Sequence, residues 1–187
     1  MKINFIVSLL FLQIISTSCK KDPVVTPNTS VEHFYATEVY VMLKQDLSSE
    51  QIFDFINKFD LKVENIGPNF YLSDLPKDSL EYVLNYVSNK EYTKNAEGLA
   101  IEGFYDSGEN KISINTGLYN MENKSYQADW LDTIKKLKLS LKKNKDYNNS
   151  IFFRVSEGKE KEWVEKFKNY DEVETAHLYH YVIDYIK

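Results

Sequence analysis

The sequence predicts an α+β fold in which amphipathic helices pack on antiparallel sheets, and three observations lead to that class. Apolar and polar residues alternate in several short segments, as they do in strands that bury one face. Between these segments, apolar residues recur every three or four positions, as in helices that pack on one side. The composition is 43% hydrophobic and 27% charged, with a mean hydropathy of -0.45. Those values exclude a multi-span membrane protein, a disordered chain and a collagen-like repeat.

The first two predicted elements are a strand and a capped helix. Residues 38–44 alternate between apolar and polar side chains, which predicts a strand. Ser48 then begins a helix, because Gln51, three residues later, can complete a capping box. The buried stripe of this helix would consist of Ile52, Phe55, Ile56 and Phe59.

Two strands and a second helix follow. Residues 61–66 are strand-like and lead into Gly67-Pro68-Asn69, a strong turn signal, after which residues 70–73 would form the partner strand. Asp78 and Glu81 have the spacing of a second capping box. The apolar stripe of the helix that follows would be Leu80, Val83, Leu84 and Val87.

The rest of the chain again alternates strands with helices. Strands are predicted at residues 99–105, 111–118, 151–155 and 173–185. One helix carries Trp130, Ile134, Leu137 and Leu141 at helical spacing, and another carries Trp163, Val164 and Phe167. The strand at 99–105 would complete a ferredoxin-like β-α-β-β-α-β unit. We therefore expect such a unit at residues 37–97, packed against a second α+β unit at residues 98–187.

A row of lysines shares the period of the Trp130 helix. The row consists of Lys135, Lys138, Lys142 and Lys145. A nucleic-acid surface is one interpretation, but the chain has a single arginine, Arg154, and a net charge of -5. Nucleic-acid readers usually rely on arginine for bidentate contacts to phosphates and bases. A solvated helix face is the preferred interpretation, and no nucleic-acid partner is expected.

Residues 1–18 have the anatomy of a signal peptide. The apolar run at residues 5–15 is shorter than the ~20 residues that a membrane-spanning helix needs. Cys19, the single cysteine, follows three small residues, so no intramolecular disulfide can form. The segment Ile15-Ser16-Thr17-Ser18-Cys19 resembles the lipobox of bacterial lipoproteins, with serine where leucine is usual. The resemblance implies that Cys19 is lipidated and anchors the protein to the membrane; the alternative is an ordinary secretory signal.

The residues that follow the cysteine indicate where the anchor would lie. Lys20, Lys21 and Asp22 resemble the charged signal that sends some lipoproteins to the outer face of the outer membrane. The resemblance implies a lipid anchor in the outer membrane with surface display, and a periplasm-facing anchor is the alternative. Residues 19–36 would carry the lipid and act as a flexible tether, because this stretch contains two prolines and little periodicity.

The sequence contains no motif for a catalytic nucleophile, a metal or a cofactor. His177 and His180 would share a face on a helix, whereas the predicted strand points them to opposite faces. Neither a G-x-S-x-G elbow nor a glycine-rich phosphate loop is present. We therefore expect no metal, no cofactor and no enzymatic activity. The alternative is a small envelope hydrolase with two carboxylates that are distant in sequence and close in space.

Tyrosines on the last predicted strand form the candidate binding surface. Tyr179, Tyr181 and Tyr185 lie on one face of that strand, in a chain with 14% aromatic residues. Exposed tyrosines make good contact surfaces because they bury a large area at a low entropic cost. Core packing and cross-strand pairing are the alternative explanation. The predicted function is a protein- or peptide-binding module.

Two stretches resemble subtilisin-type propeptides and their stand-alone inhibitor relatives in hydrophobic pattern. Residues 38–89 are similar to the β-α-β-β-α core of that module, and residues 151–182 to its closing strand. In that family the sheet packs on the protease and the C-terminal tail lies in its active-site cleft. The resemblance implies an inhibitor or folding assistant that acts in trans through peptide or edge-strand binding. The same topology carries many unrelated functions.

Overall fold

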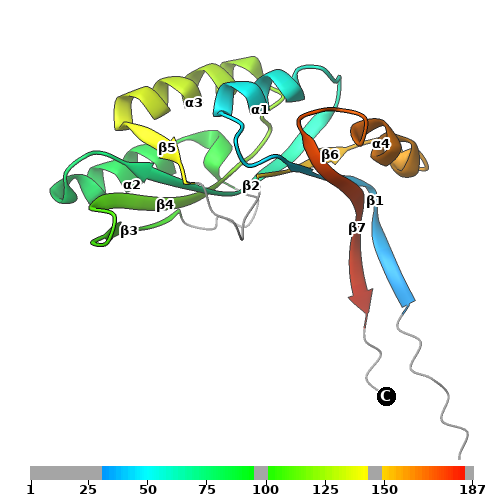
Figure 1. The fold of residues 1–187 in the computed structure, drawn as a ribbon, viewed down its shortest axis with the longest axis horizontal. Coiled ribbons are helices and arrows are strands. Elements are labelled where there is room, and N and C mark those ends of the chain that lie inside the picture. Colours follow the sequence, from blue (N-terminus) through cyan, green and yellow to red (C-terminus); the bar gives the residue numbers. More distant parts are fainter. Residues whose placement is uncertain (1–30, 95–100, 143–148, 184–187) are drawn as a thin grey trace, which may run out of the picture.

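One antiparallel sheet forms the centre of the molecule (Figure 1). The computed structural model describes residues 31–94, 101–142 and 149–183. Within these residues the strands pair in the order β3-β4-β2-β6-β1-β7, and the short β5 pairs with β2 beside that path. The strands are β1 (Val31–Leu43), β2 (Lys62–Ser73), β3 (Glu102–Asp106), β4 (Lys111–Leu118), β5 (Leu139–Leu141), β6 (Ser150–Arg154) and β7 (Val173–Ile183). The helices are α1 (Ser49–Ile56), α2 (Leu80–Ser88), α3 (Lys124–Leu137) and α4 (Glu160–Phe167), with short 3₁₀ helices η1 (Lys77–Ser79) and η2 (Glu91–Thr93). The predicted α+β class is confirmed.

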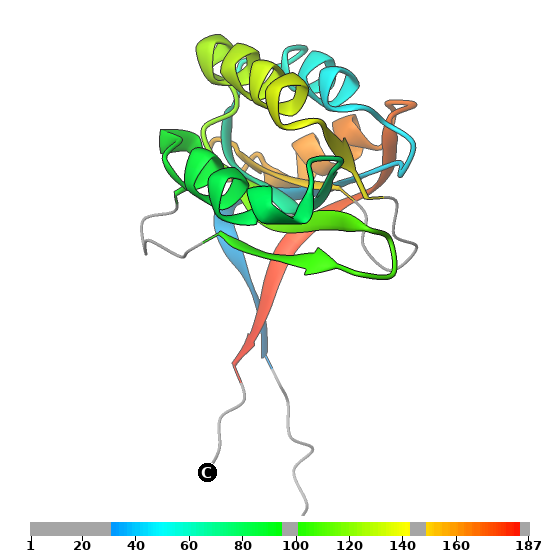
Figure 2. The ribbon, with the colours of Figure 1, turned by 90° about the vertical axis from the view of Figure 1, so that its left-hand side faces the viewer.

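The four α-helices cover one face of this sheet (Figures 1 and 2). Phe167 of α4 stacks on Phe153 of β6 with 4.8 Å between ring centroids, and Phe55 of α1 lies 6.3 Å from the same ring. Trp130 of α3 donates its indole N–H to the hydroxyl of Tyr71 on β2 at 3.2 Å. The core between the layers also contains Val39, Val41, Val63, Ile66, Ile112 and Ile114 from the strands, and Val83 and Val87 from α2. The opposite face, called the helix-free face below, carries no helix of the described part of the chain.

The segments β1-α1-β2 and β6-α4-β7 interleave to form an outer unit. β6 pairs with both β1 and β2, and β1 pairs with both β6 and β7, always antiparallel. Each segment therefore has a strand of the other segment between its own two strands, which is the split β-α-β arrangement of a ferredoxin-like sheet. The ferredoxin-like topology thus occurs, but its second half comes from residues 150–183 and not from the strand predicted at 99–105.

A second unit of the same topology is inserted into the outer unit. The later part of β2 pairs with β4 and β5, and β4 pairs with β3, again antiparallel. The strand order β5-β2-β4-β3 repeats the order β7-β1-β6-β2 of the outer unit, with α2 and α3 in the places of α1 and α4. The described structure therefore nests one unit inside the other, with β2 common to both. This nesting differs from the expected division into consecutive units at residues 37–97 and 98–187.

β2 is one continuous strand at the place where the sequence predicts a turn. Ile66 pairs with Leu118 and Asn69 pairs with Thr116, so three residue steps on β2 match two steps on β4. The segment Gly67-Pro68-Asn69 is therefore a β-bulge within the strand, and the turn prediction is wrong. A bulge is one of the few places in a sheet that tolerates proline, which has no N–H to donate to a ladder.

The first predicted capping box is confirmed and the second is wrong. At the start of α1, Ser48 Oγ accepts from the backbone N–H of Gln51, and Gln51 Oε1 accepts from the backbone N–H of Ser48. α2 begins directly after η1, with Ser79 as its N-cap and no side-chain capping bond. Asp78 and Glu81 therefore do not form the predicted box, because the 3₁₀ turn of η1 replaces the capped start.

α3 ends earlier than its apolar pattern suggests. Lys138 follows the helix in the left-handed conformation with a φ of 50°, which is a common way for a helix to end. Leu141 consequently belongs to β5 and not to the helix. The predicted lysine face is split as well, because Lys135 lies on α3 whereas Lys142 forms an ion pair at the β3–β4 turn. Lys145 lies outside the described residues.

β1 and β7 extend side by side beyond the rest of the sheet (Figures 1 and 2). Their pairing reaches Val31 opposite Ile183. Residues 31–36, which were expected in the tether, are therefore part of β1. The predicted signal peptide and Cys19, Lys20, Lys21 and Asp22 lie outside the described residues. Within the described residues, no helix combines the length and apolar composition that crossing a bilayer requires.

Candidate functional site

An aromatic cluster lies on the helix-free face where β1, β6 and β7 run next to one another. It consists of Tyr40, Phe152, His177 and Tyr179. Tyr40 stands opposite Phe152 on one side and opposite His177 on the other. The ring of Tyr40 lies 5.0 Å from that of Phe152 and 4.7 Å from that of His177, and the rings of Phe152 and Tyr179 are 5.1 Å apart. Because strand residues alternate in direction, the same strands that bury Val39 on the helix side gather these rings on the other.

The cluster is held in shape by its own contacts. Phe152 meets Tyr40 and Tyr179 edge to face, at interplanar angles of 68° and 88°, which is a favoured geometry for aromatic pairs. Tyr179 remains 38% exposed. His177 is exposed, whereas Tyr40 and Phe152 are half-buried. The rings therefore form a surface that is both accessible and fixed before any ligand arrives.

Ion pairs lie beside the cluster on the next row of the sheet. Arg154 of β6 is in register with Lys62 of β2 and Glu38 of β1. Its guanidinium contacts the carboxylate of Glu64 through Nε at 2.5 Å and that of Glu38 through Nη2 at 3.8 Å. Lys62 Nζ also lies 2.9 Å from Glu64 Oε1. These charges pair with one another and leave the aromatic cluster itself without a buried charge.

A pocket of about 350 Å³ adjoins the cluster toward β2 and β4 and is called the face pocket. Its lining residues are Tyr40, Asn65, Gly67, Asn115, Gly117, Tyr119, Ser150 and Phe152. The hydroxyl of Ser150 donates to the carbonyl of Gly67 and so fixes that side of the floor. Tyr40 and Phe152 belong to both the pocket and the aromatic cluster, so the two features form one continuous surface.

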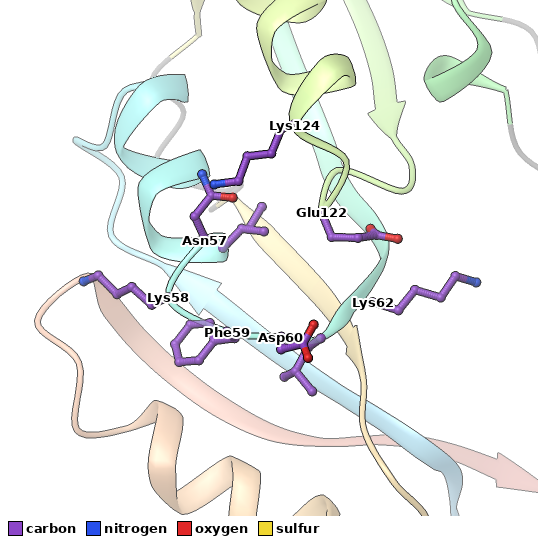
Figure 3. A pocket seen from close by; sticks show the side chains of 9 residues that line it. Asn57, Lys58, Phe59, Asp60, Lys62, Glu122 and Lys124 are labelled. Carbon is purple, nitrogen blue, oxygen red and sulfur yellow. The ribbon is translucent and has the colours of Figure 1, made fainter.

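A larger pocket, of about 660 Å³, lies where α1 meets β2 and the start of α3 (Figure 3). The segment 57–61, between α1 and β2, forms one wall, and Glu122 and Lys124 form another. The charged groups here do not converge on one point, since Lys58 and Lys62 extend in opposite directions. Glu122 accepts a hydrogen bond from the backbone N–H of Val63 at 3.0 Å. Two carboxylates, those of Asp60 and Glu122, line this junction pocket.

The largest pKa shifts belong to two hydrogen-bonded tyrosines outside the aromatic cluster, Tyr71 of β2 and Tyr92 of η2. Burial raises the pKa of Tyr71 to about 12. Asp129 of α3 accepts bonds from Lys90 at 2.9 Å and from the hydroxyl of Tyr92 at 2.6 Å, and these bonds lower the pKa of Asp129. Burial, together with the bond to Asp129, raises the pKa of Tyr92. A tyrosine nucleophile would need a lowered pKa, whereas the pKa of Tyr92 is raised. The hydrogen bonds of Asp129 to Lys90 and Tyr92 connect η2 and its N-cap to α3, which is a structural role.

The structure places one of the three predicted surface tyrosines in the candidate site. Tyr179 belongs to the aromatic cluster, whereas the side chain of Tyr181 and all of Tyr185 lie outside the described part. His177 also belongs to the cluster, where it packs on Tyr40, and the side chain of His180 is not described. Among the described residues, no group of three His, Cys, Asp or Glu side chains could hold a metal ion.

Sequence reasoning missed Tyr40, Phe152 and the two asparagines of the face pocket. Alternation within each strand could show that Tyr40 and Phe152 point away from the core. It could not show that they lie opposite each other, because they are far apart in sequence and meet through cross-strand register. A signal for Tyr40 and Phe152 was present: each is an aromatic residue at a strand position that alternation assigns to the solvent-facing side.

Comparisons of the chain with protein-family models, with curated proteins and with solved structures found no match. The functional argument therefore rests on the geometry described above.

Proposed function

We propose that the protein is a binding module of the cell envelope, without catalytic activity of its own, that presents its aromatic cluster to a protein or peptide partner. A lipid on Cys19 would tie it to the outer membrane. The observation that carries this proposal is the contiguous, pre-ordered group of four aromatic rings on the helix-free face. No cofactor and no nucleic acid form part of the proposal.

The composition of this surface supports a protein partner. Tyrosine and arginine are among the residue types that most often dominate the binding energy of protein interfaces. Tyr179 and Tyr40 lie beside Arg154, whose charge is compensated by Glu64 and Glu38. An interface with rings at its centre and paired charges at its rim matches the usual anatomy of a protein contact. The rings need little further ordering on association, which lowers the entropic cost of binding.

The resemblance to subtilisin-type propeptides suggests one version of this function. In that family the sheet packs on the protease, and the helix-free face is the corresponding surface here. The partner would then be a secreted serine protease, and the module would inhibit it or assist its folding. Incubation of the purified full-length protein with secreted subtilisin-type proteases tests this version. Unchanged protease activity together with no complex on size-exclusion chromatography would count against it.

A matched pair of tyrosine variants tests the general proposal. Tyr179→Ala removes a ring of the aromatic cluster, and Tyr82→Ala removes a ring that is 49% exposed on α2, in the helix layer. The wild type and both variants are immobilised and incubated with envelope and secreted proteins. We expect Tyr179→Ala to weaken retention of the specific partner by about thirtyfold, as loss of a hot-spot residue does, and Tyr82→Ala to leave it unchanged. Equal retention by all three proteins would refute the proposal.

The hydrolase alternative has one observation in its favour, which is the junction pocket. Asp60 and Glu122 both line it beside Phe59. A glycosidase with two carboxylates would lose nearly all activity on replacement of either one. The test is an assay on chromogenic glycosides with the wild type, Asp60→Asn and Glu122→Gln. Activity that both variants abolish would favour the hydrolase, and activity that survives both would exclude this pocket as its site.

The proposed anchor has a separate test. Cys19→Ser removes the thiol that the lipid would modify. We expect the protein to move from the membrane fraction to the soluble fraction while its thermal transition stays the same. A serine variant that stays in the membrane fraction would contradict the anchor and leave the binding proposal unaffected.

A further inference from the structure

The face pocket differs from the other pockets described here in the charge of its lining. None of its lining residues is charged, although 27% of the chain is. The junction pocket contains lysines and carboxylates. A pocket at the β3–β4 edge includes Glu102, and one at the start of α1 includes Asp46 and Glu50. A lining without charged side chains therefore favours a neutral ligand over a charged one in the face pocket.

Two asparagines of the face pocket have hydrogen-bonding capacity that no described residue uses. Asn65 Oδ1 is buried and accepts no hydrogen bond. The side chain of Asn115, half-buried on β4, makes no hydrogen bond to any described residue. Buried polar groups in proteins are nearly always satisfied, so unsatisfied ones need an explanation. A ligand that donates a hydrogen bond to Asn65 Oδ1 and bonds to the carboxamide of Asn115 would use this capacity.

We propose that the face pocket binds one ring of a neutral saccharide. Sugar hydroxyls both donate and accept, as do the carboxamides of Asn65 and Asn115. The C–H face of a pyranose is apolar and can lie against the aromatic rings of Tyr40, Tyr119 or Phe152. The volume of about 350 Å³ is at the lower end of the ~300–1,000 Å³ range of small-molecule pockets, which suits a single sugar ring.

The chemistry of the pocket favours a sugar over a protein side chain. An aromatic or aliphatic side chain from a partner would require apolar walls and would leave the two carboxamides unsatisfied. A peptide backbone would find its hydrogen-bonding groups at a sheet edge, whereas this pocket lies over the centre of the sheet between β1 and β4. The inference goes beyond the proposed protein contact. It shares Tyr40 and Phe152 with that contact, so a bound sugar and the partner would compete.

The first test is calorimetric titration of the full-length protein in detergent with a panel of neutral oligosaccharides. The panel contains trimers of glucose, mannose, galactose and N-acetylglucosamine, with a galacturonic acid trimer as the charged comparison. We expect at least one neutral trimer to bind and the uronic acid to bind more weakly. Absence of binding by every neutral trimer, or tighter binding of the uronic acid, would overturn the proposal.

Asparagine variants assign the binding to the pocket. Asn115→Ala removes a carboxamide from the face pocket, and Asn85→Ala removes an exposed one from α2 as the matched control. We expect Asn115→Ala to weaken saccharide binding roughly fivefold or more, as loss of one hydrogen bond does, and Asn85→Ala to have no effect. Equal affinities of the two variants would show that the sugar binds elsewhere.

A glycine variant narrows the pocket without removing any polar group. A Cβ at Gly117 would lie 3.0 Å from both Asn65 Oδ1 and Tyr119 Oη, so Gly117→Ala forces these groups to shift. Gly108→Ala, in the β3–β4 turn, is the control. We expect Gly117→Ala to weaken saccharide binding roughly tenfold and Gly108→Ala to leave it unchanged, while both variants keep the wild-type far-UV spectrum. Full binding by a folded Gly117→Ala would overturn the assignment.

The two proposals fail independently. Tyr179 does not line the face pocket, so Tyr179→Ala should weaken retention of the protein partner while leaving saccharide affinity within about twofold. Loss of saccharide binding in Asn115→Ala with normal retention of the partner would support this inference alone. The reverse outcome would support the protein contact and overturn the saccharide site.

Discussion

At the scale of single residues, Thr37 and Glu160 form an unusual link between β1 and the start of α4. Thr37 has a φ of 71°, a conformation that β-branched residues rarely adopt. Its N–H donates to Glu160 Oε1 at 2.9 Å, and its carbonyl accepts from the N–H of Val155 at 2.8 Å. Glu160 is 5% exposed although it is charged. Tertiary hydrogen bonds therefore hold a backbone conformation that the residue alone would not choose.

Replacement of Thr37 by glycine should stabilise the protein. The left-handed backbone costs a non-glycine residue ~1–3 kcal/mol, whereas glycine adopts it freely. Glycine loses ~0.5–1 kcal/mol more backbone entropy on folding, so we expect a net gain on the order of 1 kcal/mol in the free energy of unfolding. Urea denaturation measures it. Thr175→Gly, in β7, is the control and should destabilise the protein. If Thr37→Gly lowers the free energy of unfolding by as much as Thr175→Gly does, the backbone of Thr37 is not strained.

Glu160→Gln should change how stability depends on pH. Hydrogen bonds to the carboxylate, first among them the bond from the Thr37 N–H, hold the pKa of Glu160 below its ordinary value of 4.5. A lowered pKa in the folded state means that the ionised form stabilises the fold above pH 4.5, and that this stabilisation is lost as the pH falls through the folded-state pKa. The difference in unfolding free energy between wild type and variant should therefore be largest at neutral pH and shrink under acid.

Urea denaturation at a series of pH values from neutral to acid measures this difference. Glu174→Gln, at an exposed position of β7, is the control for loss of a surface charge. A difference between wild type and Glu160→Gln that stays constant with pH would show that the carboxylate acts through packing alone.

At the scale of elements, α2 and β3 approach each other closely because Gly103 has no side chain. A Cβ at this position would lie 2.6 Å from Leu84 Cδ2 on α2, 2.9 Å from Ile114 Cγ2 and 2.9 Å from the carbonyl oxygen of Ser113. The last of these belongs to the backbone of β4, which cannot move without disturbing the sheet. The edge strand β3 therefore depends on this glycine for its contact with the helix layer.

Gly103→Ala should consequently destabilise the protein, whereas Gly108→Ala should not. Overpacking of a core contact typically costs ~1–3 kcal/mol. At Gly108 the nearest atom would be Asp106 Oδ1 at 3.3 Å, the end of a flexible side chain, so we expect a change within about 0.5 kcal/mol. Thermal unfolding followed by circular dichroism compares the two variants. Equal melting temperatures would mean that α2 and β3 separate readily.

The elements themselves were largely predictable from local patterns, and their assembly was not. Alternation located β4 and β6, and the serine–glutamine pair located the start of α1. The turn prediction at Gly67-Pro68-Asn69 failed because turns and β-bulges favour the same residue types. That one error split β2, which is the strand that both units share. Pairing of β2 with β6 joins residues near 63 to residues near 153, and no local signal encodes such a distant register.

The same limit applied to the candidate site. The tyrosine on β7 could be found from one strand alone, and Tyr179 does lie on the helix-free face. Its neighbours Tyr40 and Phe152 come from two other strands, so the cluster exists only through the register of three strands. The face pocket also requires β2 and β4 at the bulge. Sites assembled across a sheet are therefore harder to predict than the strands that build them.

At the scale of the whole molecule, nesting makes the two units depend on each other. The inserted unit uses the later part of β2, and the outer unit uses the earlier part of the same strand. Asn57, the C-cap of α1, and Gln127 of α3 exchange two side-chain hydrogen bonds, at 3.0 and 2.9 Å, and so join the helix layers of both units. Neither unit can leave the sheet without breaking the other.

A single cooperative unfolding transition should follow, and the two tryptophans can report on it separately. Trp130 is buried in α3 of the inserted unit, and Trp163 lies in α4 of the outer unit. In Trp163→Phe and in Trp130→Phe, the remaining tryptophan reports on one unit. We expect the fluorescence and circular dichroism transitions to coincide within each variant, as two-state unfolding requires. A fluorescence midpoint for Trp130 at lower urea than the circular dichroism midpoint would show that the inserted unit unfolds first.

The side-by-side run of β1 and β7 gives the molecule a direction-dependent response to mechanical force. Tension applied at residues 31 and 183 would load the hydrogen bonds of this pair one at a time from Val31 opposite Ile183, so the strands would peel apart like a zipper. Tension applied at residue 31 against a partner held on the sheet would pull β1 along its own length. Among the described residues, β1 pairs only with β7 near residue 31, but from Val39 to Met42 it is paired on both sides, with β6 and β7, so many bonds would bear the load in shear together. The β1–β7 pair should thus resist force weakly when residues 31 and 183 are drawn apart and strongly when β1 is pulled along its length against the sheet.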